Sequence, residues 1–217
     1  MKVVVVASGE IHAPDATWLD DADLVIAADG GAGTLDRLGL RPNLLVGDLD
    51  SIDLLLLDRL EAGGTRVERH PIDKEASDTE LAVAAAFDAG ASAVVVLGAM
   101  GGARIDHEIA NLLLLADASL AGRDIRVVRG GTQVRPLHAG ERIRLAGEVG
   151  DLVTLLPAGG AAGGVTTEGL RWPLVAATLE MGRSRGLSNE VIAAPASVQI
   201  SNGTLLVVET ASRGGFS

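Results

Sequence analysis

The stretch LLVGDLDS, residues 44–51, ends a short apolar run with a glycine and two closely spaced aspartates. The apolar run is typical of a strand that is buried on both faces, as in a parallel sheet. A turn needs one aspartate at most, so Asp48 and Asp50 supply more negative charge than the turn requires. We therefore expect a positive group to be held at the end of this strand.

Further apolar runs occur on both sides of this stretch, and segments with helical patterns separate them. Ser77 followed by Glu80 is a capping-box signature that predicts a helix start, and Gly90 is a natural stop. Alternating strands and helices predict a parallel α/β sheet that is covered on both faces. The expected strands are 3–7, 24–28, 44–46, 65–69, 93–97 and 125–128, and helices are expected after Asp29-Gly30-Gly31, at 52–62, at 77–90 and around 109–116.

The pattern changes near Arg129, after which short apolar segments are separated by glycine, proline and asparagine and no helix is evident. This pattern predicts an all-β sandwich. Asn202-Gly203, between VQIS and TLLVVE, predicts a two-residue hairpin turn, and the Gly/Ala-rich residues 158–164 predict a loop. We expect two domains, an α/β domain with a mostly parallel sheet at 1–129 and a β-sandwich at 130–217.

The composition argues against disulfide-rich, secreted and membrane-spanning classes of protein. The 217 residues include no cysteine, so neither a disulfide framework nor a thiolate metal site can form. The apolar run at the N-terminus is too short for a signal peptide, and glycines interrupt the weakly charged residues 81–103, which favours a helix and strand over a membrane span. We expect a soluble, cytoplasmic protein.

The charge is unevenly distributed along the chain. The net charge is −11, which argues against a nucleic-acid partner. Residues 1–128 hold 22 acidic and 10 basic residues, whereas residues 129–217 hold 7 and 8. The acidity of the first part either serves solubility or reflects carboxylates gathered for a metal.

Polar residues follow the expected parallel strands, and ligands of open α/β sheets bind at this edge. The sequence has neither a Walker phosphate loop nor the dinucleotide fingerprint, so a phosphate site here would use carboxylates and Mg²⁺. Arg104 is suited to a bidentate contact with a phosphate. The candidates are Asp29, Gly30, Asp48, Asp50, Asp78, Arg104, Asp106 and His107.

Each candidate also has an ordinary structural explanation. Asp78 suits the positive end of a helix dipole, and Asp48 or Asp50 suits an Asx-turn. Arg104 and Asp106 could form a surface ion pair, Asp29 could lie in a plain turn, and His107 could be structural. Because all of them fall on one edge of one sheet, we favour a functional site.

Several motifs in order resemble the thiamine pyrophosphokinase family. They are ADGGA (28–32), VGDLDS (46–51), SDTELA (77–82), GAMGGARIDH (98–107) with ANLLLL (110–115), GLRWPL (169–174) and GLSNE (186–190). The resemblance implies an ATP-binding α/β domain, a thiamine-binding β-sandwich, and transfer of a diphosphoryl group from ATP to thiamine. It also implies a homodimer, with thiamine held between the α/β domain of one subunit and the β-domain of the other.

The resemblance assigns roles residue by residue. Asp48, Asp50, Asp78 and Asp106 match the carboxylates for Mg²⁺ and phosphate, and Arg104 matches the phosphate arginine. Asp29 lies near the reacting groups, with Gly30 beside it. The residues that face thiamine are Trp172, Ser188 and Asn189.

This sequence departs from the family pattern at two places. Ala103 is inserted before Arg104, which puts the local register of that loop in doubt, and Trp172 replaces a common tyrosine. A tryptophan still stacks well on a flat cationic ring. Two alternatives stay open from the residues: a diphosphokinase for another small alcohol, such as a hydroxymethylpterin, and a non-catalytic thiamine or nucleotide sensor.

Overall fold

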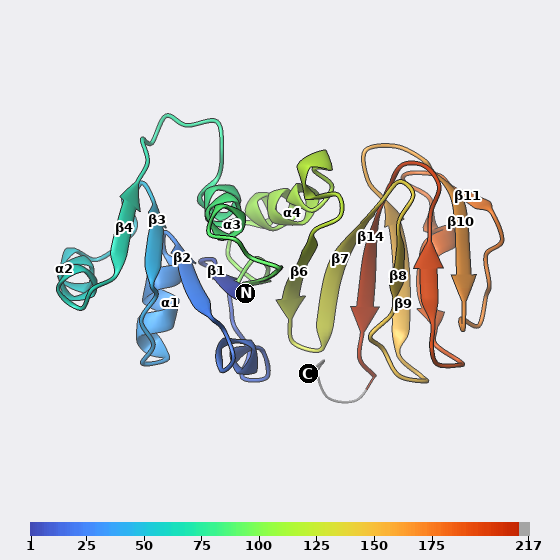
Figure 1. The fold of residues 1–217 in the computed structure, drawn as a ribbon, viewed down its shortest axis with the longest axis horizontal. Helices are drawn as coiled ribbons and strands as arrows, with labels where there is room; N and C mark the ends of the chain where they lie inside the picture. The colour runs from blue at the N-terminus through green and yellow to red at the C-terminus, as the bar shows by residue number, and fades with distance from the viewer. Residues whose placement is uncertain (213–217) are drawn as a thin grey trace. The chain divides into compact units, whose positions relative to one another are not determined.

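The computed structural model describes residues 1–212 and divides into two compact units. The first unit comprises residues 1–111 with 127–130, and the second comprises 112–126 with the chain from 131 onward. Figure 1 shows helices and strands in the first unit and strands as the main elements of the second. The division falls within helix α4 (Ile105–Leu114) and strand β6 (Asp124–Arg129).

The first unit contains a parallel sheet in the order β5-β1-β2-β3-β4. The central strand β1 is an unbroken run of valines, and Val3 to Val6 are fully buried. Burial on both faces explains why these strands read as continuous apolar runs. The strands are β1 (Lys2–Val6), β2 (Leu24–Ala28), β3 (Leu44–Gly47), β4 (Arg66–Arg69) and β5 (Ala93–Leu97).

Helices connect these strands, and their starts follow local capping chemistry. The Asp53 side chain accepts hydrogen bonds from two backbone N–H groups at the start of α2, and Ser77 accepts one from the Glu80 N–H at the start of α3 (3.2 Å). Leu35 of α1 packs in one core cluster with Val4 and Val6. The helices are η1 (Asp15–Leu19), α1 (Gly31–Arg37), α2 (Leu54–Ala62), α3 (Asp78–Asp88) and α4.

The second unit is a β-sandwich of two antiparallel sheets, in the orders β12-β9-β14-β7 and β11-β10-β13-β8. Its core combines Val153 and Val207 from one sheet with Val165 and Val198 from the other. The strands are β7 (Thr132–His138), β8 (Arg142–Arg144), β9 (Leu152–Pro157), β10 (Ala162–Glu168), β11 (Ala177–Leu179), β12 (Asn189–Glu190), β13 (Ser197–Gln199) and β14 (Thr204–Thr210). Two short 3₁₀ segments, η2 (Ala118–Leu120) and η3 (Ser184–Gly186), complete this unit.

The predicted fold class, an α/β domain followed by a β-sandwich, is confirmed, but the predicted hairpin at Asn202-Gly203 is wrong. Strand β13 pairs with β8 and β10, whereas β14 pairs with β7 and β9. Gly203 has a φ of +82°, but Asn202 is not among the residues with positive φ, and a type I′ hairpin turn needs both. The turn instead carries the chain from one sheet to the other, because Val198 and Leu205 both belong in the core between the sheets.

Two smaller expectations also change. The predicted loop at 158–164 ends early, because Ala162 is fully buried and begins β10 opposite Leu179 of β11. Strand β7 was not expected, since Pro136 interrupts its apolar pattern. Among residues 1–212, no helix combines the length and apolar character needed to cross a bilayer.

Candidate functional site

Three carboxylates from distant parts of the chain converge at one edge of the parallel sheet. Asp29 follows β2 and Asp48 follows β3, and these two strands are parallel neighbours. Asp78 is the first residue of α3, which packs against both strands. One oxygen from each of the three side chains lies within 4.8 Å of the others. We refer to this group as the carboxylate cluster.

Strained backbone brings the cluster together. Asp29 has a φ of +42°, and its N–H donates to the Val46 carbonyl at 2.8 Å. Gly47 has a φ of +153°, and a Cβ added there would lie 3.1 Å from Asp29 Cβ and 3.2 Å from Asp78 Oδ1. Glycine at position 47 therefore provides both the backbone angle and the space that two carboxylates need to approach.

The Asp29 carboxylate is buried and only partly satisfied. Its Oδ2 accepts a hydrogen bond from the Ser51 hydroxyl, whereas its Oδ1 has no hydrogen-bond partner among residues 1–212. Buried polar atoms almost always have partners. An unpartnered oxygen beside two further carboxylates suits a hard cation, and the residues therefore fit Mg²⁺, which binds carboxylate and phosphate oxygens.

Lys74, which the sequence analysis did not single out, contacts two members of the cluster. Its Nζ lies 2.7 Å from Asp78 Oδ1 and 3.3 Å from Asp48 Oδ2, and 14% of its side chain is exposed. Burial lowers the pKa of Lys74, but its ion pairs with Asp78 and Asp48 outweigh burial, so the pKa lies above its ordinary value. The spacing of Lys74 and Asp78 does not predict this contact, because four-residue spacing brings side chains together along a helix, and Lys74 lies in the loop before α3.

Asp50 lies beside the cluster but is not one of its three members. It is exposed, and its backbone N–H donates to Asp48 Oδ1 at 3.3 Å. This bond lowers the pKa of Asp48, while the Asp48 charge raises the pKa of Asp50. The two-residue offset is that of an Asx-turn, so Asp48 has both its turn role and its place in the cluster.

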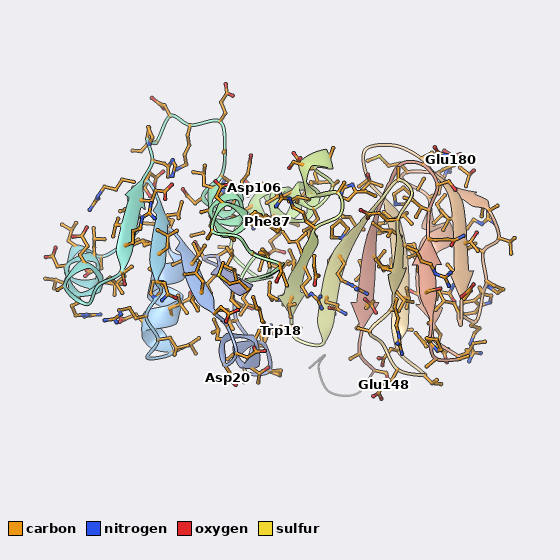
Figure 2. The ribbon with its side chains drawn as sticks, viewed as in Figure 1. Trp18, Asp20, Phe87, Asp106, Glu148 and Glu180 are labelled. Carbon is orange, nitrogen blue, oxygen red and sulfur yellow. The ribbon has the colours of Figure 1, made fainter. Side chains whose placement is uncertain are left out.

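Arg104 and Asp106 pair with each other and lie outside the cluster. Arg104 Nε and Nη2 contact the two Asp106 oxygens at 2.9 and 2.5 Å, and both side chains are more than half exposed. The hydrogen bond from Arg104 holds the pKa of Asp106 at about 2. Figure 2 labels Asp106, which lies in the first turn of α4. His107 is also exposed.

The loop before α4 is held by two side chains that the sequence analysis missed. Glu108 accepts a hydrogen bond from the Gly101 N–H at 2.9 Å, and Asn111 donates to the Ala99 carbonyl at 2.9 Å. Both return from α4 to the preceding loop. They stabilise the loop that contains Ala103.

A cavity of about 450 Å³ opens at the carboxyl ends of β1 and β5. The neighbours of β1 are β2 on one side and β5 on the other, so the strand order reverses here, and ligands of open α/β sheets bind at such points. Gly9 permits close approach of the two loops, since a Cβ there would lie 2.4 Å from the Gly98 carbonyl oxygen. The lining includes Ser8, Gly9, Glu10, Thr34, Arg37 and Gly102.

In the β-sandwich, Asn189 joins the two motifs that the resemblance assigned to thiamine. Its Oδ1 accepts from the Trp172 N–H at 3.0 Å and from the Glu190 N–H at 2.9 Å, and its Nδ2 donates to the Trp172 carbonyl at 2.8 Å. Asn189 is buried, whereas Trp172 is 59% exposed. The asparagine therefore holds the backbone that presents the tryptophan to solvent.

The neighbours of Trp172 leave its ring accessible. The Arg171 guanidinium lies 5.9 Å from the centre of the ring and pairs with Glu190 at 3.0 Å. Ser188 has a φ of +54°, and its N–H donates to Thr154 Oγ1 at 2.9 Å. An exposed indole is suited to stacking on a flat cationic ring.

Known proteins match both parts of the chain. A family model described as thiamin pyrophosphokinase, catalytic domain, matches residues 16–128, and one described as thiamin pyrophosphokinase, vitamin B1 binding domain, matches residues 141–205. The chain belongs to the thiamin pyrophosphokinase family. The resemblance inferred from the sequence motifs is thereby confirmed.

Individual members of the thiamin pyrophosphokinase family align over nearly the whole chain. The thiamine pyrophosphokinase of Bacillus subtilis (strain 168) is 26% identical over 213 residues, which cover 97% of this chain and 99% of that protein. A crystal structure of thiamine pyrophosphokinase from Bacillus subtilis has a TM-score of 0.86 at 23% identity and covers 98% and 100% of the two chains. Thiamin pyrophosphokinase from Candida albicans has a TM-score of 0.80 at 17% identity, with 96% and 88% covered. These structures share the fold of this chain.

Proposed function

We propose that this protein transfers the diphosphoryl group of ATP to the hydroxyl of thiamine, with thiamine diphosphate and AMP as products. The observation that carries the proposal is the match of both family models, catalytic and vitamin B1 binding, in one chain. The thiamine-binding match does not favour another small alcohol as acceptor. The carboxylate cluster in the catalytic match does not favour a sensor without catalysis.

Phosphoryl-type transfer asks the protein mainly for positioning and for neutralisation of charge. Asp29, Asp48 and Asp78 would hold Mg²⁺, which supplies neutralisation of the negative charge on the phosphate oxygens. Asp50 and Asp106 do not belong to the cluster, but we also propose that they bind the metal–nucleotide complex. Both side chains are exposed, so a bound nucleotide and its metal could reach them.

Arg104 is the proposed donor to the phosphates of ATP. Its guanidinium already makes a two-point contact with the Asp106 carboxylate, which is the geometry that a phosphate accepts. His107, on the first turn of α4, is proposed to lie beside the nucleotide, and Gly30 beside the reacting groups. A carboxylate beside the reacting groups, Asp29 or Asp106, is proposed to accept or orient the hydroxyl proton of thiamine.

Thiamine is the proposed ligand of the Trp172 region. Trp172 would stack on a cationic ring of the vitamin, and Ser188 would contact it from the neighbouring motif. Asn189 is proposed to belong to this site, and its described contacts are with the backbone of Trp172 and Glu190. The proposed functional boundaries are 1–129 for ATP binding and catalysis and 130–217 for thiamine binding and dimerisation.

A homodimer with thiamine at the subunit interface is also part of the proposal. Its support is the apolar face of α4, where Ile105, Ile109 and Leu113 recur every fourth residue and are at least half exposed. Exposed apolar stripes of this kind mark interaction surfaces. The proposed compartment is the cytoplasm, which suits a chain without cysteine.

The function is tested by incubating the purified protein with ATP, Mg²⁺ and thiamine and separating the products by chromatography. AMP with thiamine diphosphate is the expected result. ADP with thiamine monophosphate would exclude diphosphoryl transfer, and turnover only with a hydroxymethylpterin would replace thiamine as the acceptor.

The variant Asp48→Asn tests the carboxylate cluster in the same assay. We expect turnover to fall about 100-fold or more, because a carboxylate that would hold the charge-neutralising Mg²⁺ at the reacting phosphates is lost. Circular dichroism checks that the fold is intact. Near-normal turnover would remove Asp48 from the proposed metal site.

A further inference from the structure

Lys74 is one of only two lysines in the sequence, the other being Lys2. We propose that the Lys74 ammonium is the resident cation of the carboxylate cluster in the metal-free protein, and that a divalent cation binds there by displacing it. The inference rests on the proposed function for the presence of the divalent cation. It adds that the metal exchanges with a side chain of this chain.

The geometry places the ammonium in the space that a metal would use. Lys74 Nζ contacts Asp78 Oδ1 at 2.7 Å and Asp48 Oδ2 at 3.3 Å. A Mg²⁺ ion bonds carboxylate oxygens directly, at about 2.0–2.1 Å, so an ion held by these two atoms would compete with the Lys74 ammonium for the same oxygens. Two positive charges at the same oxygens also repel strongly.

The negative charge of the cluster explains why a cation is needed there in both the metal-free and the metal-bound protein. Three carboxylates within 4.8 Å of one another repel, and one ammonium offsets a single charge. Asp29 Oδ1 still has no hydrogen-bond partner among residues 1–212. A lysine thus stabilises the cluster only in part, whereas a divalent cation can satisfy all three carboxylates.

Lys74 lies on a segment that allows the exchange. It belongs to the loop between β4 and α3, and its backbone N–H donates to the Ile72 carbonyl at 2.9 Å within that loop. Its neighbours Asp73 and Glu75 are exposed, and Ile72 is 71% exposed. The long side chain can therefore leave the cluster while Ser77 keeps the start of α3 in place.

The exchange should make the cluster bind a metal–nucleotide complex better than a free metal ion. A free divalent cation displaces the Lys74 ammonium and offers it no new anionic partner. A metal carried by a polyphosphate brings anionic oxygens that can accept the displaced ammonium, which remains tethered close to the cluster. The metal–nucleotide complex should therefore be favoured over the free ion.

The two lysines allow a direct test by NMR. A chain labelled with ¹³C at lysine Cε should give two side-chain signals. The variant Lys2→Met assigns them, because it lacks the Lys2 signal. Lys2 is a matched internal control, because it also pairs with an aspartate, Asp21, and is the first residue of β1, at the opposite end of the parallel strands from the cluster. On addition of Mg²⁺, the Lys74 signal should shift and the Lys2 signal should not.

Binding of Mn²⁺ without nucleotide, followed by electron paramagnetic resonance, supplies the second readout, since Mn²⁺ binds the same oxygen ligands. Lys74→Met should bind Mn²⁺ about tenfold more tightly than the unaltered chain, within the usual range of coupling between sites, and Lys2→Met should bind it equally. Lys74→Gln replaces the methionine variant if that variant does not fold.

The outcomes separate this inference from the proposed function. Equal or weaker Mn²⁺ binding by the Lys74 variants, or a Lys74 signal that does not respond to Mg²⁺, would overturn the exchange. A chain that shows the exchange but makes no thiamine diphosphate would leave the exchange standing and remove the proposed function.

Discussion

Replacing Asn189 with alanine tests whether this residue acts through Trp172. The side chain makes three hydrogen bonds, two to the Trp172 backbone and one to the Glu190 N–H. Each such bond contributes about 0.5–1.5 kcal/mol net. Because Trp172 is exposed and water can replace part of these contacts, we expect Asn189→Ala to lower the free energy of unfolding by about 2–3 kcal/mol.

Loss of the Asn189 hydrogen bonds should also weaken thiamine binding, because these bonds hold the backbone of Trp172. With its backbone no longer held, Trp172 would sample several positions, and the KM for thiamine should rise about 10-fold or more while kcat changes less. Asn189→Asp keeps the acceptor for both N–H groups and loses only the donor to the Trp172 carbonyl, so its effect should be intermediate. Urea unfolding and steady-state kinetics measure the two quantities.

Asn202→Ala is a matched control, because Asn202 is an exposed asparagine of the same unit. It should change stability by no more than about 0.5 kcal/mol. If Asn189→Ala raised the KM for thiamine while leaving stability unchanged, the reasoning would be refuted, and direct contact between Asn189 and the vitamin would explain the effect.

Three further changes probe the core, the cluster and the arginine pair. Glu209 is fully buried and pairs with Arg135 at 2.6 Å. Glu209→Gln should lower the free energy of unfolding in urea by about 3–5 kcal/mol, because the Arg135 charge loses its partner. A smaller loss in the background of Arg135→Met would confirm the pairing. Gly47→Ala should lower kcat about 10- to 100-fold, since the new Cβ presses on two carboxylates of the cluster, and wild-type kcat would contradict this account. The pKa of Asp106 is depressed to about 2 from 3.8, so the stabilisation by Arg104 is present above pH 3.8 and is lost as the pH falls toward 2; carboxyl ¹³C NMR should show Arg104→Met restoring the pKa toward 3.8, and an unchanged value would exclude the pair as its cause.

Much of the fold follows from local patterns. The valines of β1 predicted a strand buried on both faces, and Ser77 with Glu80 predicted the start of α3, because burial and capping are read from neighbouring residues. The family was also evident from the order of its motifs. Local patterns carry little information about which strands pair, however, so Asn202-Gly203 predicts a hairpin where the chain in fact crosses from one sheet to the other.

The sequence by itself determined the two structural classes, the strand ends that carry polar residues, and the presence of Asp29, Asp48 and Asp78 among the candidates. Only the tertiary structure decided that these three converge without Asp50 and Asp106, that Lys74 contacts two of them, and that Asn189 holds Trp172. The physical reason is that a side chain's partners depend on which strands and loops are neighbours in space. That arrangement is decided by burial of the core over the whole chain, whereas spacing along the sequence reports only the local backbone.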